Sequence, residues 1–290
     1  MSSRGEAVLR RIVEDHGAAV VAHVVTARDK ATMDDGYEAI VRLARSAGIP
    51  VVDRGQPPPD DSQARFLFAV GWRWLISPRP GQQLVVFHDA LLPRYRGFAP
   101  LVSALVNGEP QVGVTALFGA AEYDRGPIIA QRAMPLHYPV TIAQVFRDIA
   151  PVYAELASEV VSLAMRGELR GVDQNESRAT YSLWRDDMDY LVDLRWDAAR
   201  IRRFVDAVGP PYKGALVQLE GVPCRIRACA ELPDVVIENR TPGKVIFMQD
   251  GKPVVVCGTG TLRIDALNDK QGRDLLPLPR FRMRFTGRTD

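Results

Sequence analysis

The fold is decided by the stretch Val85-Val86-Phe87-His88-Asp89-Ala90-Leu91-Leu92-Pro93-Arg94-Tyr95-Arg96-Gly97-Phe98-Ala99-Pro100. It begins as the end of a buried strand and breaks at His88 into a polar loop. Open α/β sheets bind ligands where strands end, because loops and helix N-termini converge there. A histidine at that point can donate, accept or transfer a proton near neutral pH. The alternative is a structural histidine bonded to a loop carbonyl.

This stretch resembles the active-site segment of the folate-dependent formyltransferases, the family that includes the methionyl-tRNA, glycinamide-ribonucleotide and sugar N-formyltransferases. The family pattern reads Asn-x-His, then x-Ser-Leu-Leu-Pro-x-Tyr-Arg-Gly, with a proline shortly after. Two positions depart from it: Asp89-Ala90 replaces small polar residues, and Val86 stands where the family carries asparagine. The matching positions are His88, Leu91, Leu92, Pro93, Tyr95, Arg96, Gly97 and Pro100.

A second loop resembles the second signature of the same family. The strand Val112–Phe118 leads into Gly119 to Ile129, which resembles the family's Gly-Val-Thr followed by Asp-x-Gly-x-Ile. Asp124 follows His88 by 36 residues, the separation expected for the paired His and Asp of that family. Taken alone, an aspartate in a glycine-flanked turn is a turn former. The two signatures together favour a catalytic pair.

The composition is that of an ordinary globular protein. The chain has 290 residues, 47% hydrophobic and 25% charged, with a net charge of +2. This charge gives no bulk electrostatic argument for binding nucleic acid or membranes. No apolar run is long enough to predict a membrane span, and the N-terminus is too charged for a secretory signal. The three cysteines lack a paired spacing, which predicts reduced thiols and not a disulfide framework or a zinc site. We therefore expect a cytoplasmic protein. Whether it forms a homodimer is left open.

Strands alternate with helical stretches, which predicts an α/β fold with a doubly wound, mostly parallel sheet. Ser2-Ser3-Arg4-Gly5 looks like a first turn whose strand is missing, so we expect a late start or another replacement for that central strand. The expected elements are helices over 6–15, 35–47 and 101–107, strands over 18–26, 49–52, 66–70, 84–87 and 112–118, and a helix pair over 141–164.

We predict three regions: a formyltransferase-type catalytic domain over 1–170, a linker and connecting helix over 171–210, and an OB-like β domain over 211–290. Within the linker region, 167–177 is polar and 198–208 is an amphipathic helix. The short strands expected beyond it span 216–219, 224–229, 235–238, 244–248, 254–256 and 262–264, a pattern typical of a small barrel. The basic cluster 280–288 is interpreted as a solvated tail.

The resemblance implies transfer of a formyl group from N10-formyltetrahydrofolate to an amine. His88 would face the developing oxyanion and move the proton, and Asp124 would hold the His88 tautomer. The folate would lie against Leu91, Leu92, Pro93, Ala120, Ala121, Glu122 and Tyr123. The substrate is assigned Asp89, Tyr95, Arg96, Trp72 and Trp74. The alternative is that the two tryptophans only pack over the hydrophobic core.

Val86 cannot make the hydrogen bond that the family's asparagine donates to the formyl oxygen. Losing one such donor costs on the order of 100- to 1000-fold in rate. We consider three explanations, in this order. Asp89, a backbone N–H or an ordered water replaces the donor; or the chain uses another one-carbon or acyl donor; or it binds folate or a nucleotide-sugar without turnover.

We expect the acceptor to be a small primary amine, an amino sugar carried on a nucleotide. The segments 181–187 and 212–215 resemble the formyltransferases of surface-polysaccharide and secondary-metabolite pathways. Methionyl-tRNA is the alternative acceptor, and it would need a positive surface to hold phosphates.

Overall fold

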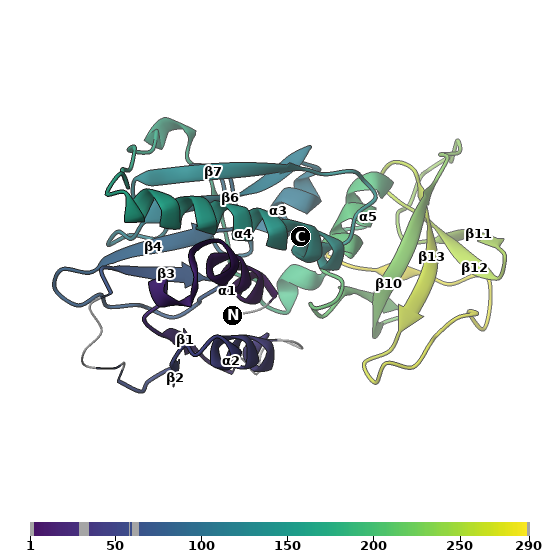
Figure 1. Ribbon diagram of the computed structural model, residues 1–290. Coiled ribbons are helices and arrows are strands. Elements are labelled where there is room, and N and C mark those ends of the chain that lie inside the picture. Colours follow the sequence, from purple (N-terminus) through teal and green to yellow (C-terminus); the bar gives the residue numbers. More distant parts are fainter. Residues whose placement is uncertain (1–2, 29–34, 58, 60–63, 289–290) are drawn as a thin grey trace. The chain divides into compact units, whose positions relative to one another are not determined.

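The computed structural model describes residues 3–28, 35–57, 59 and 64–288, which form two compact units (Figure 1). Unit 1 comprises 1–100, 110–136 and 144–183, and unit 2 comprises 101–109, 137–143 and 184–290. The region 171–210, predicted as a separate linker, is therefore divided between the units. Its first part pairs with strands of unit 1, and its helix packs on unit 2.

Unit 1 is a mixed α/β unit, as predicted. Its helices and strands, with short 3-10 turns marked η, are α1 (Ser3–His16), η1 (Ala18–Val20), β1 (Val24–Thr26), α2 (Tyr37–Ser46), β2 (Val51–Asp53), β3 (Phe66–Val70), β4 (Gln83–His88), β5 (Arg96–Gly97), β6 (Gln111–Phe118), β7 (Ile128–Pro135), most of α4 (Ile142–Met165), η2 (Glu176–Arg178) and β8 (Tyr181–Ser182).

The sheet places the end of β4 at the functional edge. The order is β3-β4-β6-β7; β3 and β4 run parallel, β4 and β6 antiparallel, and β6 and β7 antiparallel. His88, the last residue of β4, pairs with Thr115 of β6. β7 was not predicted, because its exposed face interrupts the apolar run that indicates a buried strand.

A second, two-stranded sheet pairs β1 with β2 in parallel. Within the described ranges, β1 and β3 are each paired on one side only, and no strand joins the two sheets. The apolar faces of α1 and α2 pack around Leu9, Ile40 and Ala44. Ser2 lies outside the described residues, while Ser3 to Gly5 start α1 and form no separate turn.

Two local predictions for this part of the chain are wrong. The run 18–26 forms η1 and the short β1, because Gly17 leaves α1 at φ 80° and the next residues turn back. The expected helix pair is the single helix α4, with Pro151 inside it. Its apolar positions continue at helical spacing on both sides of the proline, so packing compensates for one lost hydrogen bond.

Unit 2 is dominated by a curled antiparallel sheet in the order β11-β12-β13-β10-β9-β14. A bridge between Lys244 and Arg284 brings the two ends of this order together. The three cysteines are buried and free. The elements of unit 2 are α3 (Pro100–Asn107), η3 (Met188–Tyr190), α5 (Ala198–Ala207), β9 (Ala215–Leu219), β10 (Val222–Leu232), β11 (Val245–Gln249), β12 (Lys252–Val256), β13 (Thr261–Asn268) and β14 (Phe285–Thr286).

The strand predicted over 235–238 is also wrong. This segment has no regular secondary structure, and Val236 is 96% exposed. Val235 is exposed as well, so the two valines give no reason for the segment to join the sheet. The other predicted strands of this unit are present, with each end within four residues of its expected position.

Asp206 on α5 should make the stability of the protein depend on pH. Burial raises its pKa to about 6, and Arg202, at 3.6 Å, offsets burial only in part. The folded state therefore keeps a proton that the unfolded state releases above pH 4, so stability falls as the pH rises from about 4 to 6. Asp206→Asn should raise the free energy of unfolding by about 2 kcal/mol at pH 7.5 and leave it unchanged at pH 3.5.

Urea unfolding of the whole protein, followed by circular dichroism, measures this difference. Asp265→Asn is the matched control. Burial acts to raise the pKa of Asp265, but its ion pairs with Arg263 and Lys252 outweigh burial and lower it. That variant should be destabilised at pH 7.5. Equal effects of the two substitutions would contradict the assignment.

Candidate active site

His88 is positioned by the end of β4 and by the loop that follows it. Its side chain is buried, with 8% of the residue exposed, and its Nε2 lies 2.9 Å from the carbonyl oxygen of Tyr95. Tyr95 has a left-handed φ of 59°, and its N–H bonds to Thr180 Oγ1 at 2.9 Å. The loop carbonyl that was expected for a merely structural histidine is therefore present.

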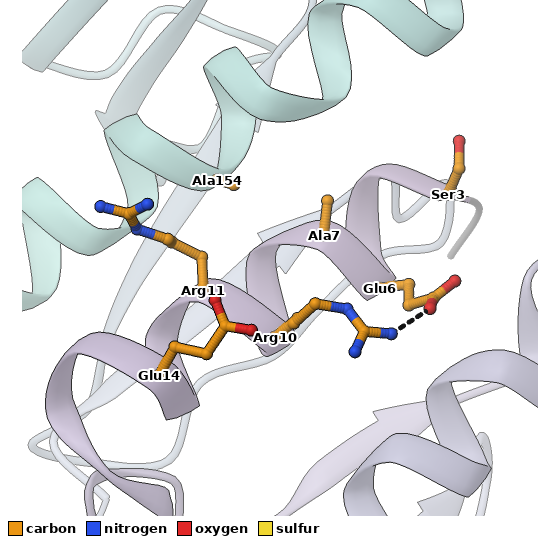
Figure 2. Close-up of a pocket in the computed structure, with 7 residues that line it drawn as sticks. All are labelled: Ser3, Glu6, Ala7, Arg10, Arg11, Glu14 and Ala154. Carbon is orange, nitrogen blue, oxygen red and sulfur yellow. Dashed lines mark hydrogen bonds and ion pairs between the residues drawn. The ribbon is translucent and has the colours of Figure 1, made fainter.

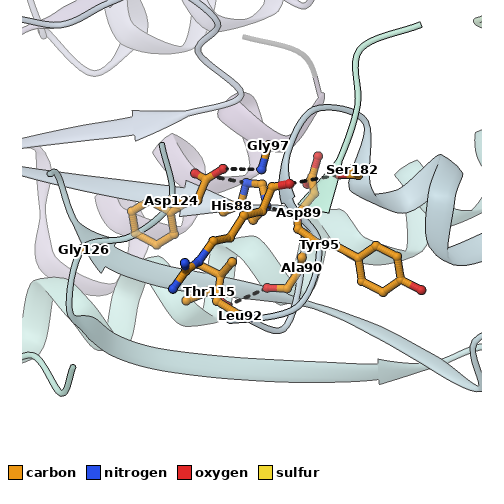
Figure 3. Close-up of polar contacts among 12 residues, drawn as sticks. His88, Asp89, Ala90, Leu92, Tyr95, Gly97, Thr115, Asp124, Gly126 and Ser182 are labelled. Atoms are coloured by element: carbon orange, nitrogen blue, oxygen red, sulfur yellow. Dashed lines mark hydrogen bonds and ion pairs between the residues drawn. The ribbon is translucent and has the colours of Figure 1, made fainter. Parts of the chain in front are cut away.

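Asp124 occupies the turn between β6 and β7 and faces His88, as the sequence predicts. Its Oδ1 lies 3.5 Å from His88 Nδ1, and its Oδ2 accepts a 2.8 Å hydrogen bond from Gly97 N–H (Figure 3). Gly97 must be glycine: its φ is 98°, and a Cβ there would lie 2.5 Å from the carbonyl oxygen of Ser182. The N–H of Gly97 thus fixes one oxygen of the Asp124 carboxylate.

These contacts give the two ring nitrogens of His88 different tasks. A carbonyl only accepts, so Nε2 carries a proton while it bonds to Tyr95. Nδ1 then has a lone pair when the ring is neutral, and it donates toward Asp124 only when the ring is protonated. Nδ1 is therefore the nitrogen that can take up a proton beside a carboxylate that stabilises the resulting charge.

Thr115 and Gln131 support the loop after His88, and neither was selected from the sequence. The buried Thr115 hydroxyl donates to the carbonyl of Ala90 at 2.6 Å and accepts from the N–H of Leu92 at 3.1 Å. Gln131 Nε2 donates to Thr115 Oγ1 and to the carbonyl of Leu92, at 2.8 and 2.9 Å. Thr115 belongs to the Gly-Val-Thr signature, which was the available signal; nothing marked Gln131.

Gln174 was missed because it lies in a polar segment interpreted as a linker. Its Nε2 donates to the carbonyls of Asp124 and Gly126, at 2.7 and 2.8 Å. Its Oε1 accepts from Arg96, whose guanidinium also bonds to Glu176 at 2.7 Å. The segment is thus part of the site, and Arg96, predicted to bind substrate, is fully buried and holds this segment in place.

Asp89 follows His88 at the start of the loop. Its carboxylate pairs with Arg4 of α1 and accepts a hydrogen bond from the Tyr153 hydroxyl of α4. Burial acts to raise the pKa of Asp89, but Arg4 and Tyr153 outweigh it, and the pKa is lowered. An ionised carboxylate accepts and does not donate, so Asp89 cannot replace the missing oxyanion donor.

Comparison with known proteins decides the family. A model described as Formyl transferase matches residues 62–161, and one described as Formyl transferase, C-terminal domain, matches 186–278. Together they cover more than half of the chain. The chain belongs to the formyl transferase family.

Relatives and solved structures agree with this family. A methionyl-tRNA formyltransferase of Roseiflexus sp. (strain RS-1) is 33% identical over 202 residues, which cover 67% of this chain and 58% of that protein. An N-formyltransferase from Helicobacter canadensis, in complex with folinic acid and dTDP-3-aminofucose, has a TM-score of 0.67 at 15% identity. The match covers 90% of this chain and 95% of that one.

A third similar protein is HypX from Aquifex aeolicus in complex with tetrahydrofolic acid, with a TM-score of 0.60 at 19% identity. The match covers 86% of this chain and 44% of HypX. At these identities the two structural likenesses concern the fold. The chain spans about three fifths of the length of the Roseiflexus relative.

In this formyl transferase chain, Val86 lies two residues before His88 on β4 and is half-buried. It pairs with Ala69 of β3 and Leu117 of β6. Its neighbours are thus apolar backbone partners, and its isopropyl group offers no hydrogen-bond donor. Of the three donors expected to replace the asparagine, a backbone N–H and a water remain.

The remaining positions predicted to bind folate lie on the two loops. Leu92 is buried, Leu91 and Pro93 are half-buried, and Ala120, Ala121, Glu122 and Tyr123 are exposed. Exposed loop backbone beside a buried His–Asp pair suits a ligand that enters from solvent. The contact of these residues with folate stays a prediction.

Trp72 and Trp74 pack edge-on against each other, with ring centroids 5.1 Å apart, and the Arg54 guanidinium lies 4.6 Å from the Trp74 ring centroid. Both are half-buried. These contacts agree with the packing alternative, and their substrate role stays a prediction. Tyr95 contributes its backbone carbonyl to His88, and a substrate role for its side chain likewise stays a prediction.

A hollow of about 360 Å³ between α1 and α4 is lined by the residues drawn in Figure 2: Ser3, Glu6, Ala7, Arg10, Arg11, Glu14 and Ala154. Arg10 pairs with Glu6 and Arg11 with Asp15, each at 2.7 Å. These charges are satisfied within α1 and suggest no ligand. Over the described ranges there is no cluster that could hold a metal ion, and no helix long and apolar enough to cross a membrane.

Proposed function

We propose that this protein transfers a formyl group from N10-formyltetrahydrofolate to the primary amine of a small acceptor. One observation carries the proposal: His88 and Asp124, from two signature loops, face each other at 3.5 Å in a chain of the formyl transferase family. Both side chains are held by backbone groups of neighbouring segments. Such preorganisation is what a proton-transfer site requires.

In this proposal Nδ1 of His88 takes the proton that the amine loses as it attacks, and returns it to the departing nitrogen. Asp124 stabilises the protonated ring between these two events. Its second oxygen stays bound to Gly97, so the carboxylate does not turn away. The chemistry of the folate is confined to supplying the formyl group. The protein contributes orientation and the path of the proton.

Formyltetrahydrofolate is supported as the donor by the site and by similar proteins. The backbone of Ala120 to Tyr123 is exposed beside Asp124, where a flat ring can lie against it. HypX and the Helicobacter protein are described in complex with tetrahydrofolic acid and folinic acid. The two loops therefore fit the role of a folate-binding edge.

For the acceptor, a nucleotide-linked amino sugar is our first candidate. The Helicobacter protein, which matches nearly the whole length of both chains, is in complex with such a compound. The net charge of +2 offers little to a polyanion. Methionyl-tRNA is the second candidate, favoured by the name of the Roseiflexus relative.

The test mixes the protein with N10-formyltetrahydrofolate and either nucleotide-linked amino sugars or methionyl-tRNA, and follows release of tetrahydrofolate. We expect release with an amino sugar. Release with the tRNA alone would select the second acceptor. Release should quicken in Val86→Asn, by up to about 100-fold if the missing donor limits the rate.

The matched control is Val85→Asn, which alters the neighbouring, fully buried position of β4. Should folate bind while no acceptor provokes release, even in Val86→Asn, the transferase proposal would be overturned. The protein would then be a folate-binding or nucleotide-sugar-binding protein without turnover.

A further inference from the structure

Two aromatic rings flank the His88–Asp124 pair: Phe98 has no role so far, and Tyr123 is predicted only as part of the loop that lies against the folate. Phe98 follows Gly97, and Tyr123 precedes Asp124. Phe98 is 50% exposed and Tyr123 74% exposed, although their ring centroids are only 5.9 Å apart at an interplanar angle of 57°. The pair is therefore an aromatic surface open to solvent immediately beside the candidate catalytic groups.

The backbone beneath these rings is fixed. The hydrogen bond from Gly97 N–H to Asp124 Oδ2 ties the two residues together at 2.8 Å. Phe98 N–H donates to the carbonyl of Ser182 at 3.0 Å, and Gln174 holds the carbonyl of Asp124 at 2.7 Å. The rings thus stand on a rigid base, and a ligand that meets them finds the surface already formed.

The tryptophan pair of the same unit shows what packing looks like in this protein. Trp72 and Trp74 are half-buried and carry Arg54 over one face. Phe98 instead leaves half, and Tyr123 about three quarters, of its surface in water. Burying such rings against a flat partner is favourable through both apolar area and stacking.

We propose that Phe98 and Tyr123 form a stacking subsite for a flat heteroaromatic ring of a bound ligand. Two rings could come from the reaction that we propose: the base of a nucleotide-linked acceptor, or the ring system of the folate. Because the subsite adjoins Asp124, a ring held there places the rest of its molecule within reach of His88. The inference rests on the proposed function for its choice of ligands.

The test is calorimetric titration of the wild type, Phe98→Ala, Tyr123→Ala and the double variant. The probes are thymidine diphosphate and 5-formyltetrahydrofolate, each alone, so no turnover is needed. We expect the double variant to bind one probe at least tenfold more weakly, in keeping with the usual strength of base–aromatic stacking. A loss confined to thymidine diphosphate assigns the subsite to the acceptor, and a loss confined to the folate assigns it to the donor.

Phe98→Tyr and Tyr123→Phe keep both rings and should bind like the wild type. Phe247→Ala removes an equally exposed phenylalanine of β11 in unit 2 and serves as the matched control. The inference is overturned if the double variant binds both probes within twofold of the wild type, or if the wild type binds neither. A protein that binds but does not transfer formyl overturns only the proposed function.

Discussion

Replacement of His88 by alanine is expected to slow formyl transfer by about 100- to 10,000-fold, the range typical for loss of a general acid–base group. The loss should appear in kcat, because the ring acts on the proton during reaction and not on ground-state binding. Asp124→Asn should also slow the reaction, since it keeps an acceptor for Gly97 but removes the charge beside Nδ1. Tetrahydrofolate release under single-turnover conditions measures both.

Two variants separate chemistry from structure. His88→Gln can still donate to the Tyr95 carbonyl but cannot carry a proton at the position of Nδ1, so it should be as slow as alanine. His16→Ala removes another half-buried histidine of unit 1, whose Nε2 lies 2.9 Å from Ser158 Oγ, and should leave kcat unchanged. A His88→Ala enzyme that keeps a third of the wild-type rate would falsify the assignment.

Arg4→Met is expected to cause the largest loss of stability. It removes the cation that balances the ionised Asp89, while methionine keeps apolar contact with Phe146, whose ring centroid lies 4.9 Å from the Arg4 guanidinium carbon. Breaking one side of a largely buried ion pair should lower the free energy of unfolding by about 3 kcal/mol at pH 7.5. The pKa of Asp89 is lowered in the folded protein, so this contribution is present at neutral pH and fades as the pH falls below about 4.

Urea unfolding at pH 7.5 and pH 3.5 tests this difference. Arg10→Met is the matched control on the same helix: Arg10 pairs with Glu6 at the surface, where such a pair contributes about 0.5 kcal/mol. Arg4→Lys should recover part of the loss. If Arg4→Met and Arg10→Met lower the free energy of unfolding equally, the Arg4–Asp89 pair contributes no more than a surface pair, and the prediction is wrong.

The sequence was most informative where residue type and spacing coincide. His88 and Asp124 could be predicted as partners because two separate stretches resemble the two signatures of the formyltransferases, at the separation expected for that family's paired His and Asp. The strands that precede them were predicted because buried central strands are continuous apolar runs. The structure places these two side chains beside each other, at 3.5 Å.

The supporting residues could not be predicted, because their signal is not local. Gln174 is a polar residue in a polar stretch, and only the folded chain shows that its amide meets the carbonyl of Asp124. Likewise, β7 exposes the successive residues Gln131, Arg132 and Ala133, and it is recognised only by its pairing with β6. Asp89 was predicted to bind substrate. Its carboxylate instead pairs with Arg4 and accepts a hydrogen bond from Tyr153, and both residues are distant in the sequence.

The pairing of β5 with β8 has a consequence for the order in which the site is made. Arg96 and Gly97 pair with Tyr181 and Ser182, so the first loop is closed by a segment synthesised some 85 residues later. During translation, the histidine strand and the aspartate turn leave the ribosome well before the residues that clamp them. A fragment that ends between Ile129 and Tyr181 would therefore contain both signature loops and still lack the strand that pairs with the first of them.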